Sequence, residues 1–363
     1  MTGATALLPR LLAPLLAASL LAACASGVQP IRGRLHYGMA DAPEGEKLMW
    51  PAAPEVPRFL YTGTLTGEPN FQSPDNGSGA LAEFGRWLVG LDGNGTTPLV
   101  LQRPSALVGD DAGRLYVSDA SRQAVFVFDE AAGELHLWDR AEPLVRFVAP
   151  AGLAVAPGRV FVADAELGAV FVLDARGEPR GVIGRGQLQR PTGLARDAQR
   201  GLLYVADTYA HDIKVFDDQG RLQRVIGQRG SGDGEFNYPS HLAFVRDELY
   251  VTDTMNSRVQ VFAHDGSTPL RTLGARGLYL GNLVRPKGVG VDAEGNVYVI
   301  ESYYDSLLVF SRQGDFLLPI GGTGKATGRF YLPAGVWVDA KNRVHIADMF
   351  NGRVVLFQFL GGG

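Results

Sequence analysis

Histidine is the residue type in this sequence best suited to acid–base or metal chemistry, because imidazole titrates near neutral pH and ligates transition metals. The chain has six histidines, and one of them, His241, departs from a recurring pattern. His241 stands two residues after a proline, where the equivalent prolines are followed at the same distance by small residues: Ala106, Gly152, Gly193, Gly288 and Gly335. A lone imidazole there could act as a general base or anchor a ligand, or it could simply fill space. His241 is therefore the one catalytic candidate, and both interpretations stay open.

Metal and nucleophilic sites of the familiar kinds lack their residues. A three-histidine zinc site needs imidazoles that converge, and no other histidine stands at a position like that of His241. The single cysteine, Cys24, excludes an intrachain disulfide and a multi-cysteine metal site. The sequence contains no phosphate-binding loop, EF-hand pattern or Ser-His-Asp signature. We therefore predict no cofactor, and leave open an oxygen-liganded divalent ion such as Ca²⁺ in a central channel.

An acidic residue recurs at the end of six similar segments that read like Leu249-Tyr250-Val251-Thr252-Asp253. These acidic residues are Asp119, Asp164, Asp207, Asp253, Glu301 and Asp348, at steps of 45, 43, 46, 48 and 47. A short carboxylate in such a place accepts hydrogen bonds from the backbone of the following turn. We predict a structural role for all six, and Glu301 departs only in its longer side chain.

The surroundings of each acidic residue also repeat. A proline and a short apolar run precede it, a second apolar run follows, and a last run ends in glycine, as in Val225-Ile226-Gly227. Each unit therefore offers four short β-rich runs, which is one blade of a propeller. The sequence predicts an all-β fold, a six-bladed β-propeller with four-stranded blades.

The two ends of the repeated region indicate how the ring closes. The last unit stops at Gly361-Gly362-Gly363 without a fourth strand, while residues 58–65 have strand character and no unit of their own. Two open sheet edges would be an aggregation hazard. We predict that the N-terminal strand completes the last blade.

The repeat resembles the NHL repeat over about residues 58–360. Its N-x-R element is intact in Asn256-Ser257-Arg258 and Asn351-Gly352-Arg353, and the other units depart from it. The resemblance implies a propeller that serves as an interaction platform. Six-bladed propellers of similar repeat also include lyases and lactonases with a metal on the central axis, so the resemblance is more specific for the fold than for the function.

Strands in a blade alternate in direction, so the prolyl entry and the loop between the second and third strands share one face. This face collects aromatic, arginine and other residues of the kind that binding surfaces favour. The prolyl entries supply Arg103, Arg190, Tyr238, His241, Arg285 and Lys287. The loops supply Arg122, Tyr209, His211, Met255, Tyr303, Tyr304 and Phe350. The alternative is that the aromatic rings pack between blades and the arginines neutralise carboxylates.

The N-terminal residues have the pattern of a targeting signal. Residues 11–24 form an apolar run of about 14 residues, shorter than the roughly 20 that a membrane-spanning helix needs. The run ends in Leu21-Ala22-Ala23-Cys24, which resembles the lipobox of bacterial lipoproteins. The resemblance implies a signal peptide at 1–23 and a lipidated Cys24, and Ala25 in place of Asp implies the outer membrane in a Gram-negative source. An ordinary signal peptide is the alternative.

The remaining division follows from composition. Residues 24–57 are proline-rich and have no sustained apolar period, so we predict that they form a tether. The propeller is predicted to span residues 58–363. The patch at 47–50 could dock on the folded body. The formal net charge of −4, with no basic block, argues against a nucleic-acid partner.

Together these observations favour a monomeric, lipid-anchored, non-catalytic scaffold of the cell envelope, facing the periplasm and binding a protein, peptide or glycan. Its only contact with the membrane would be the anchor. The alternative is a metal-dependent lyase or lactonase-like hydrolase with its site at the channel mouth.

Overall fold

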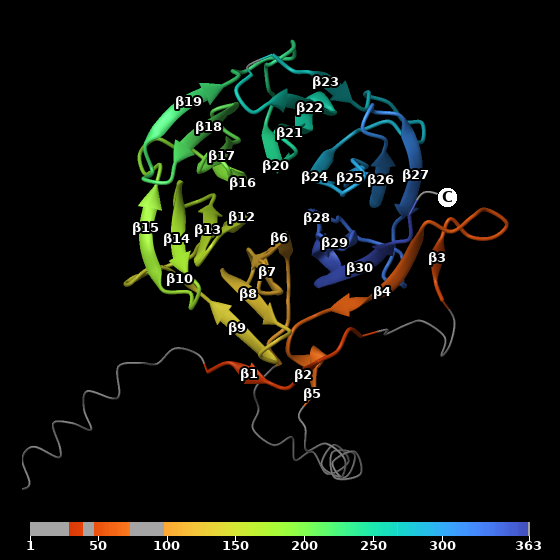
Figure 1. The fold of residues 1–363 in the computed structure, drawn as a ribbon, viewed down its shortest axis with the longest axis horizontal. Helices are drawn as coiled ribbons and strands as arrows, with labels where there is room; N and C mark the ends of the chain where they lie inside the picture. Colours follow the sequence, from red (N-terminus) through yellow and green to blue (C-terminus); the bar gives the residue numbers. More distant parts are fainter. Residues whose placement is uncertain (1–28, 39–46, 73–97, 267, 362–363) are drawn as a thin grey trace, which may run out of the picture.

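The computed structural model describes residues 29–38, 47–72, 98–266 and 268–361. Six antiparallel sheets surround a central axis, and in each the first strand lies innermost (Figure 1). Blades 1 and 2 contain β6 (Pro104–Gly109), β7 (Arg114–Asp119), β8 (Ala124–Asp129) and β9 (Glu134–Trp138), then β12 (Pro150–Ala156), β13 (Arg159–Asp164), β14 (Ala169–Asp174) and β15 (Pro179–Ile183). A short hairpin of β10 (Arg140–Glu142) and β11 (Val145–Arg146) connects them.

The next two blades follow the same order. Blade 3 contains β16 (Pro191–Asp197), β17 (Leu202–Asp207), β18 (Asp212–Asp217) and β19 (Leu222–Ile226). Blade 4 contains β20 (Pro239–Val245), β21 (Glu248–Asp253), β22 (Arg258–Ala263) and β23 (Arg271–Leu273).

Blade 5 contains β24 (Pro286–Val291), β25 (Val297–Glu301), β26 (Ser306–Phe310) and β27 (Phe316–Gly321). Blade 6 contains β28 (Val336–Val338), β29 (Arg343–Asp348), β30 (Arg353–Phe359) and, as its fourth strand, β4 (Phe59–Leu65). The predicted all-β propeller with six four-stranded blades is confirmed.

The core lies between neighbouring blades. The second and third strands are buried on both faces, as at Val117 and Phe126, which have no exposed surface. Their apolar and β-branched side chains are therefore continuous rather than alternating, since a blade of this kind has a neighbour on each side.

The ring closes as predicted. β4 pairs antiparallel with β30, with Gly63 opposite Leu356 and Phe59 opposite Phe359. Phe59 is fully buried, and its ring lies 6.0 Å from that of Tyr298 in the preceding blade. The first propeller strand in the sequence therefore joins the last blade to the rest of the core.

The predicted tether at 24–57 is corrected where the structure describes it. β1 (Ile31–Arg32) adds to β9, β2 (Arg34–Leu35) pairs with β5 (Phe71–Gln72), and β3 (Met49–Trp50) adds to β4. The patch at 47–50 docks on blade 6, where the Trp50 ring lies 5.2 Å from that of Phe357. These segments cover the outer edges of blades 1 and 6, and covering an edge prevents unwanted strand pairing.

The predicted signal peptide at 1–23 and the lipidation site Cys24 lie outside the described residues. Within the described part of the chain, no helix combines the length and the apolar character that crossing a bilayer requires. The lipoprotein signal therefore stays a prediction.

Glu248 holds an ion-pair cluster at the start of β21. Its carboxylate accepts hydrogen bonds from Arg271 at 2.6 Å, Tyr250 at 2.7 Å and Arg312 at 3.1 Å. These bonds, led by those from Arg271, lower the pKa of Glu248 from 4.5 to about 2 against the opposing effect of burial. A lowered folded-state pKa means that this stabilisation is complete above the unfolded pKa and disappears as pH falls from 4.5 towards 2.

Glu248→Gln should therefore lower the free energy of unfolding by about 2 kcal/mol at pH 7, since the amide keeps the shape and loses the charge. Urea denaturation of parent and variant between pH 7 and pH 2 measures this, and the difference should disappear at the acidic end. Glu178→Gln, at an exposed turn, is the matched control and should change stability by less than about 0.5 kcal/mol. A difference for Glu248→Gln that does not depend on pH would contradict the charge argument.

Candidate functional site

The acidic residue that ends each second strand fixes two loops on the same face. Asp119 is fully buried, and its Oδ2 accepts the backbone N–H groups of Gln102 at 2.6 Å and Arg103 at 2.9 Å. Its Oδ1 accepts those of Ser121 and Arg122, both at 3.0 Å. The carboxylate therefore joins the prolyl entry to the loop between the second and third strands, as predicted for a structural role.

Glu301 does the same work with a longer side chain. It is fully buried and accepts N–H groups from Val284 at 2.8 Å, Arg285 at 3.0 Å and Tyr303 at 2.9 Å. The glutamate therefore makes the same kind of backbone contacts as the aspartates of the other blades, despite its longer side chain.

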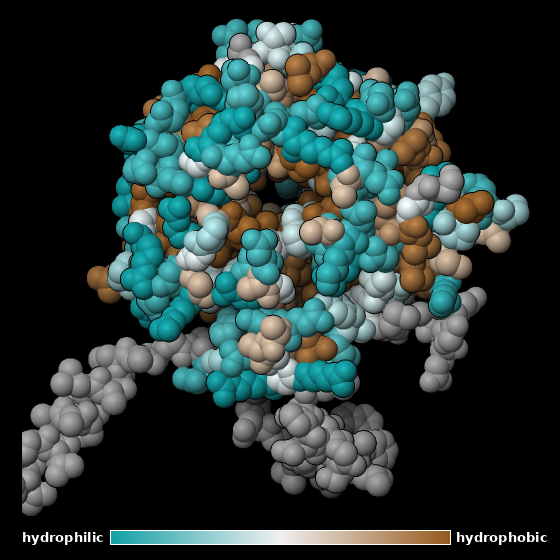
Figure 2. All heavy atoms as spheres, viewed as in Figure 1, coloured by the Kyte–Doolittle hydropathy of each residue, from teal (hydrophilic) through white to brown (hydrophobic). Residues whose placement is uncertain are grey.

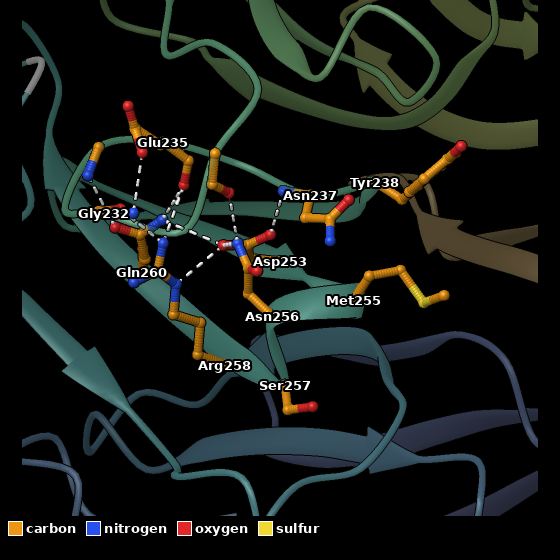
Figure 3. Close-up of polar contacts among 12 residues, drawn as sticks. Gly232, Glu235, Asn237, Tyr238, Asp253, Met255, Asn256, Ser257, Arg258 and Gln260 are labelled. Atoms are coloured by element: carbon orange, nitrogen blue, oxygen red, sulfur yellow. Dashed lines mark hydrogen bonds and ion pairs between the residues drawn. The ribbon is translucent and has the colours of Figure 1, made fainter.

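The N-x-R element fixes the loop that precedes the first strand, as Figure 3 shows for blade 4. Asn256 Nδ2 donates to Asp253 at 2.8 Å and to the Gly230 carbonyl at 2.9 Å. Arg258 donates through Nε to Asp253 at 2.8 Å and through Nη2 to the carbonyls of Gly232 at 2.7 Å and Glu235 at 2.9 Å. In blade 6, Asn351 and Arg353 make the corresponding bonds to Asp348 and to the preceding loop.

Three of these loops share one architecture. Each contains two glycines four residues apart and an isolated parallel bridge: Arg229 to Phe236, Arg276 to Leu283 and Thr323 to Phe330. Between the glycines, the loops before blades 4 and 6 carry Ser231-Gly232-Asp233 and Lys325-Ala326-Thr327. The loop before blade 5 carries Leu278-Tyr279-Leu280, whose side chains are 75%, 85% and 69% exposed. We call these three residues the apolar tip.

Blade 5 lacks the side chains that fix the sister loops. Tyr304 and Ser306 stand where blade 4 has Asn256 and Arg258, because Glu301 pairs with Ser306 as Asp253 pairs with Arg258. A serine is too short to reach the loop as the guanidinium does. A pocket of about 180 Å³ lies there, and we call it the blade-5 pocket. Its lining residues are Leu278, Tyr279, Leu280, Gly281, Asn282, Tyr304, Ser306 and Leu308.

The aromatic residues predicted for the binding face come together in small groups. Tyr209, Tyr238, Met255, Tyr303, Tyr304 and Phe350 are between 37% and 54% exposed. The Tyr209 ring lies 6.1 Å from that of Tyr238, and the rings of Tyr303 and Tyr304 are 5.0 Å apart.

The predicted arginines contact some of these rings or the backbone. The guanidinium of Arg190 lies 5.1 Å from the Tyr209 ring centre, and that of Arg103 lies 5.0 Å from the Phe350 ring centre. Arg122 donates to the Val100 carbonyl at 2.8 Å, while Arg285 is exposed and Lys287 is half-buried. Entry residues and loop residues therefore share one face. Arg190 also pairs with the Glu166 carboxylate at 2.6 Å, which is the contact that the alternative interpretation expects.

His211 is not an exposed contact of this face. It is buried, and its Nδ1 accepts the backbone N–H of Tyr238 at 3.2 Å. His211 therefore holds the backbone of Tyr238 in place and does not face a ligand. Sequence inspection also missed the apolar tip and Tyr331, whose exposed ring lies 5.6 Å from that of Phe350. Aligning the three glycine loops with one another would have found the tip.

His241 lines a small cavity of the central channel. The surrounding cavity is only about 40 Å³, and small residues of the other first strands line it. Neighbouring backbones approach closely here: a Cβ added at Gly193 would stand 2.6 Å from the Ser240 carbonyl. His241 Nδ1 lies 3.1 Å from Ser240 Oγ. Desolvation, with a contribution from the positive charge of Lys287, lowers the pKa of the imidazole, so His241 is neutral at pH 7.

A second cavity of the channel, of about 230 Å³, is lined mainly by aliphatic side chains of the first strands. Figure 2 shows the opening at the centre of the ring, with hydrophobic side chains around it. Among the residues whose positions the structure gives, no group of three or more His, Cys, Asp or Glu side chains is placed to hold a metal ion.

Comparisons with known proteins agree with this architecture. A family model described as a 6-bladed beta-propeller matches residues 196–274 and 289–362. The chain is 32% identical over 139 residues to the protein brain tumor of Drosophila melanogaster, a match that covers 38% of this chain and 13% of that protein. It is 38% identical over 101 residues to NHL repeat-containing protein 2 of Bos taurus, covering 24% of this chain and 14% of that protein. The chain thus spans a small part of the length of these relatives.

Among solved structures, a streptogramin B lyase aligns with a TM-score of 0.54 at 12% identity, covering 71% of this chain and 94% of that one. At that identity the likeness concerns the fold alone. The fold and the comparisons define a six-bladed β-propeller. Its repeats are similar to the NHL repeats of these relatives, and the N-x-R elements of blades 4 and 6 carry the similarity.

Proposed function

We propose that this chain is a non-catalytic binding module that presents the prolyl-entry face of its propeller to a protein partner. The observation that carries the proposal is the apolar tip, Leu278-Tyr279-Leu280, exposed on a loop whose sister loops carry small or polar residues. The shared backbone architecture does not require these side chains. Contiguous exposed apolar surface is typical of interaction sites.

The surroundings of the tip support a protein rather than a nucleic acid or a glycan. Tyr303, Tyr304 and Met255 lie on neighbouring loops of blades 4 and 5 and are exposed. Tyrosine, with tryptophan and arginine, is enriched among the few residues that supply most of the binding energy in protein interfaces. The blade-5 pocket gives an apolar side chain of the partner a place to insert. The similarity to NHL relatives supports the same choice, because their propellers generally bind proteins.

A test compares partners crosslinked in whole cells to the parent protein and to a variant whose tip is replaced by a sister sequence. Partners lost with the tip support the proposal, and an unchanged set of partners contradicts it.

We also propose that Cys24 carries a lipid that holds the propeller at a membrane of the cell envelope, with the outer membrane as the expected site in a Gram-negative source. The lipobox-like sequence supports this. Because β1 begins at Ile31 and pairs with β9, only six residues, and so seven Cα–Cα steps, separate the anchor from blade 1. At about 3.5 Å per residue, the propeller would stay within about 25 Å of the membrane surface.

Cys24→Ala should therefore abolish incorporation of radiolabelled palmitate and move the protein from the membrane pellet to the soluble fraction. Two or more acyl chains are needed for stable anchoring, so loss of the cysteine should release nearly all of the protein. Cell fractionation with immunoblotting measures the release, and an unchanged pellet fraction without label would contradict the anchor.

The alternative function, a metal-dependent lyase or lactonase-like hydrolase at the channel mouth, rests on the position of His241 and on the fold likeness to a lyase. His241 has Ser240 as its hydrogen-bonding neighbour, and a neutral imidazole in a cavity of about 40 Å³ leaves little room for a substrate. We favour the binding module, because the apolar tip has no use in the enzymatic interpretation.

A further inference from the structure

The connection from blade 1 to blade 2 is the hairpin of β10 and β11, residues 140–146, which we call the rim hairpin. In the described chain, the connections that lead to blades 3, 4, 5 and 6 contain no strand. Figure 1 shows β10 at the outer rim of the ring, across the ring from β23. The fold therefore does not require a hairpin where two blades are joined, and the reason for this one has to lie in its side chains.

The base of the rim hairpin is fixed in the core, whereas its tip is bare. Ala141 has no exposed surface, and Phe147, directly after the hairpin, is 1% exposed. Leu144 at the tip is 98% exposed, more than any other large apolar side chain of the described residues. Val145 and Val148 beside it are exposed as well. Grouped apolar side chains on a protein surface mark contacts with a protein or a membrane.

The charges of the rim hairpin do not oppose contact with a bilayer. Glu142 pairs with Arg185 at 2.6 Å, and Asp139 pairs with Arg146 at 3.1 Å. Arg140 is exposed, and its guanidinium donates to a backbone carbonyl of the tip at 3.0 Å. Arginine side chains beside an apolar tip can reach lipid phosphates while their apolar stems stay near the acyl chains.

The N-terminal strand brings the chain in from the side of the rim hairpin. β1 pairs antiparallel with β9, with Ile31 opposite Leu135 and Arg32 opposite Glu134. Because antiparallel strands run in opposite directions, the chain enters β1 from the end of β9 that leads into the hairpin. Seven Cα–Cα steps join Cys24 to Ile31, which is at most about 25 Å. A bilayer that holds Cys24 is therefore within reach of the hairpin.

We propose that the rim hairpin lies on the phospholipid bilayer that holds the lipid anchor, with Leu144 inserted among the acyl chains. This inference rests on the proposed lipidation of Cys24. A lipid chain alone tethers a propeller without orienting it, and a second contact selects the rim that faces the membrane. The apolar tip lies in the connection from blade 4 to blade 5, three blades from the rim hairpin. It would therefore be turned away from the membrane and accessible to a protein partner.

The test uses a fluorescent label on the full-length, lipidated protein. Leu144→Cys introduces a thiol for a nitrobenzoxadiazole label at the tip of the hairpin. Leu270→Cys is the matched control, because Leu270 is a 57% exposed leucine of blade 4, on the other side of the ring. Cys24 is the single cysteine of the sequence, and its thiol cannot react when it carries a lipid, so each variant takes one label.

The proteins are incorporated into vesicles of phosphatidylethanolamine with a minority of phosphatidylglycerol, and the vesicles are isolated by flotation. The measurement is quenching of the label by lipids that carry a spin label on the acyl chain. We expect quenching at position 144 to exceed that at position 270 by about fivefold or more, because an inserted apolar side chain lies about 5–10 Å into the boundary between headgroups and acyl chains.

Flotation with equal quenching at both positions, or with none at position 144, would overturn this inference and leave the anchor in place. If the parent protein does not float with the vesicles, the anchor is wrong and the inference falls with it. A discrete protein adduct in cells from p-benzoylphenylalanine at position 144 would also overturn it, since the hairpin would then contact a protein. None of these results bears on partner binding by the apolar tip.

Discussion

Replacing Leu278-Tyr279-Leu280 by Ser-Gly-Asp, the sequence of the sister loop before blade 4, should reduce the affinity for the partner by about 30-fold or more. The tip contains three large side chains that are more than two-thirds exposed, and they also form one wall of the blade-5 pocket. Loss of a single interface hot spot costs about 2 kcal/mol or more, which corresponds to this factor. The melting temperature should be unchanged or higher, because the tip has few contacts to lose.

The matched control is the same replacement at the sister tip, Lys325-Ala326-Thr327→Ser-Gly-Asp. That loop has the same bridge, between Thr323 and Phe330, but no apolar tip. Partners are first captured by chemical crosslinking in whole cells, and the affinity of the enriched partner is then measured with purified proteins. Equal loss of binding in both variants would show that the loops act through the fold rather than through the apolar tip.

Phe59→Ala should have the largest effect on stability, lowering the free energy of unfolding by about 3–5 kcal/mol. Phe59 is fully buried in the closing strand, with its ring 5.2 Å from that of Phe359 and 6.0 Å from that of Tyr298. Truncation leaves a cavity where blades 5 and 6 meet the N-terminal strand. Urea denaturation followed by tryptophan fluorescence measures the change.

Val56→Ala is the control for the closing strand. Val56 precedes β4 by three residues and is 72% exposed, so its truncation should change stability by less than about 0.5 kcal/mol. If Phe59→Ala also costs less than about 1 kcal/mol, the N-terminal strand does not hold the ring together.

The ring itself was predictable because each blade has to meet the same requirements. The recurring acid is needed wherever a prolyl entry meets the next loop, as the bonds of Asp119 and Glu301 show. Closure was predictable because the last repeat lacks a strand and residues 58–65 supply one. The short strands β1, β2 and β3 were not, since two-residue pairings leave no periodic signal in the sequence.

The directions of individual side chains in the candidate site could not be predicted from the sequence. Strand alternation placed the entries and loops on one face, but it did not show that His211 turns inwards to accept the Tyr238 N–H. Likewise, the register indicates that His345 is buried, as Tyr116 and Tyr298 are at the equivalent position. The structure adds that His345 Nε2 lies 3.7 Å from Asp339 Oδ2, whereas the tyrosine hydroxyls donate to their aspartates at 2.9 Å and 2.8 Å.

The most direct test of the binding module is photo-crosslinking in living cells with p-benzoylphenylalanine incorporated at Tyr279. The same residue incorporated at Gln219, an exposed turn position at the opposite face, is the comparison. We predict that illumination yields a discrete adduct with one partner protein from position 279 and none from position 219. No adduct from position 279, or the same adduct from both positions, would contradict the proposal that the apolar tip binds a protein partner.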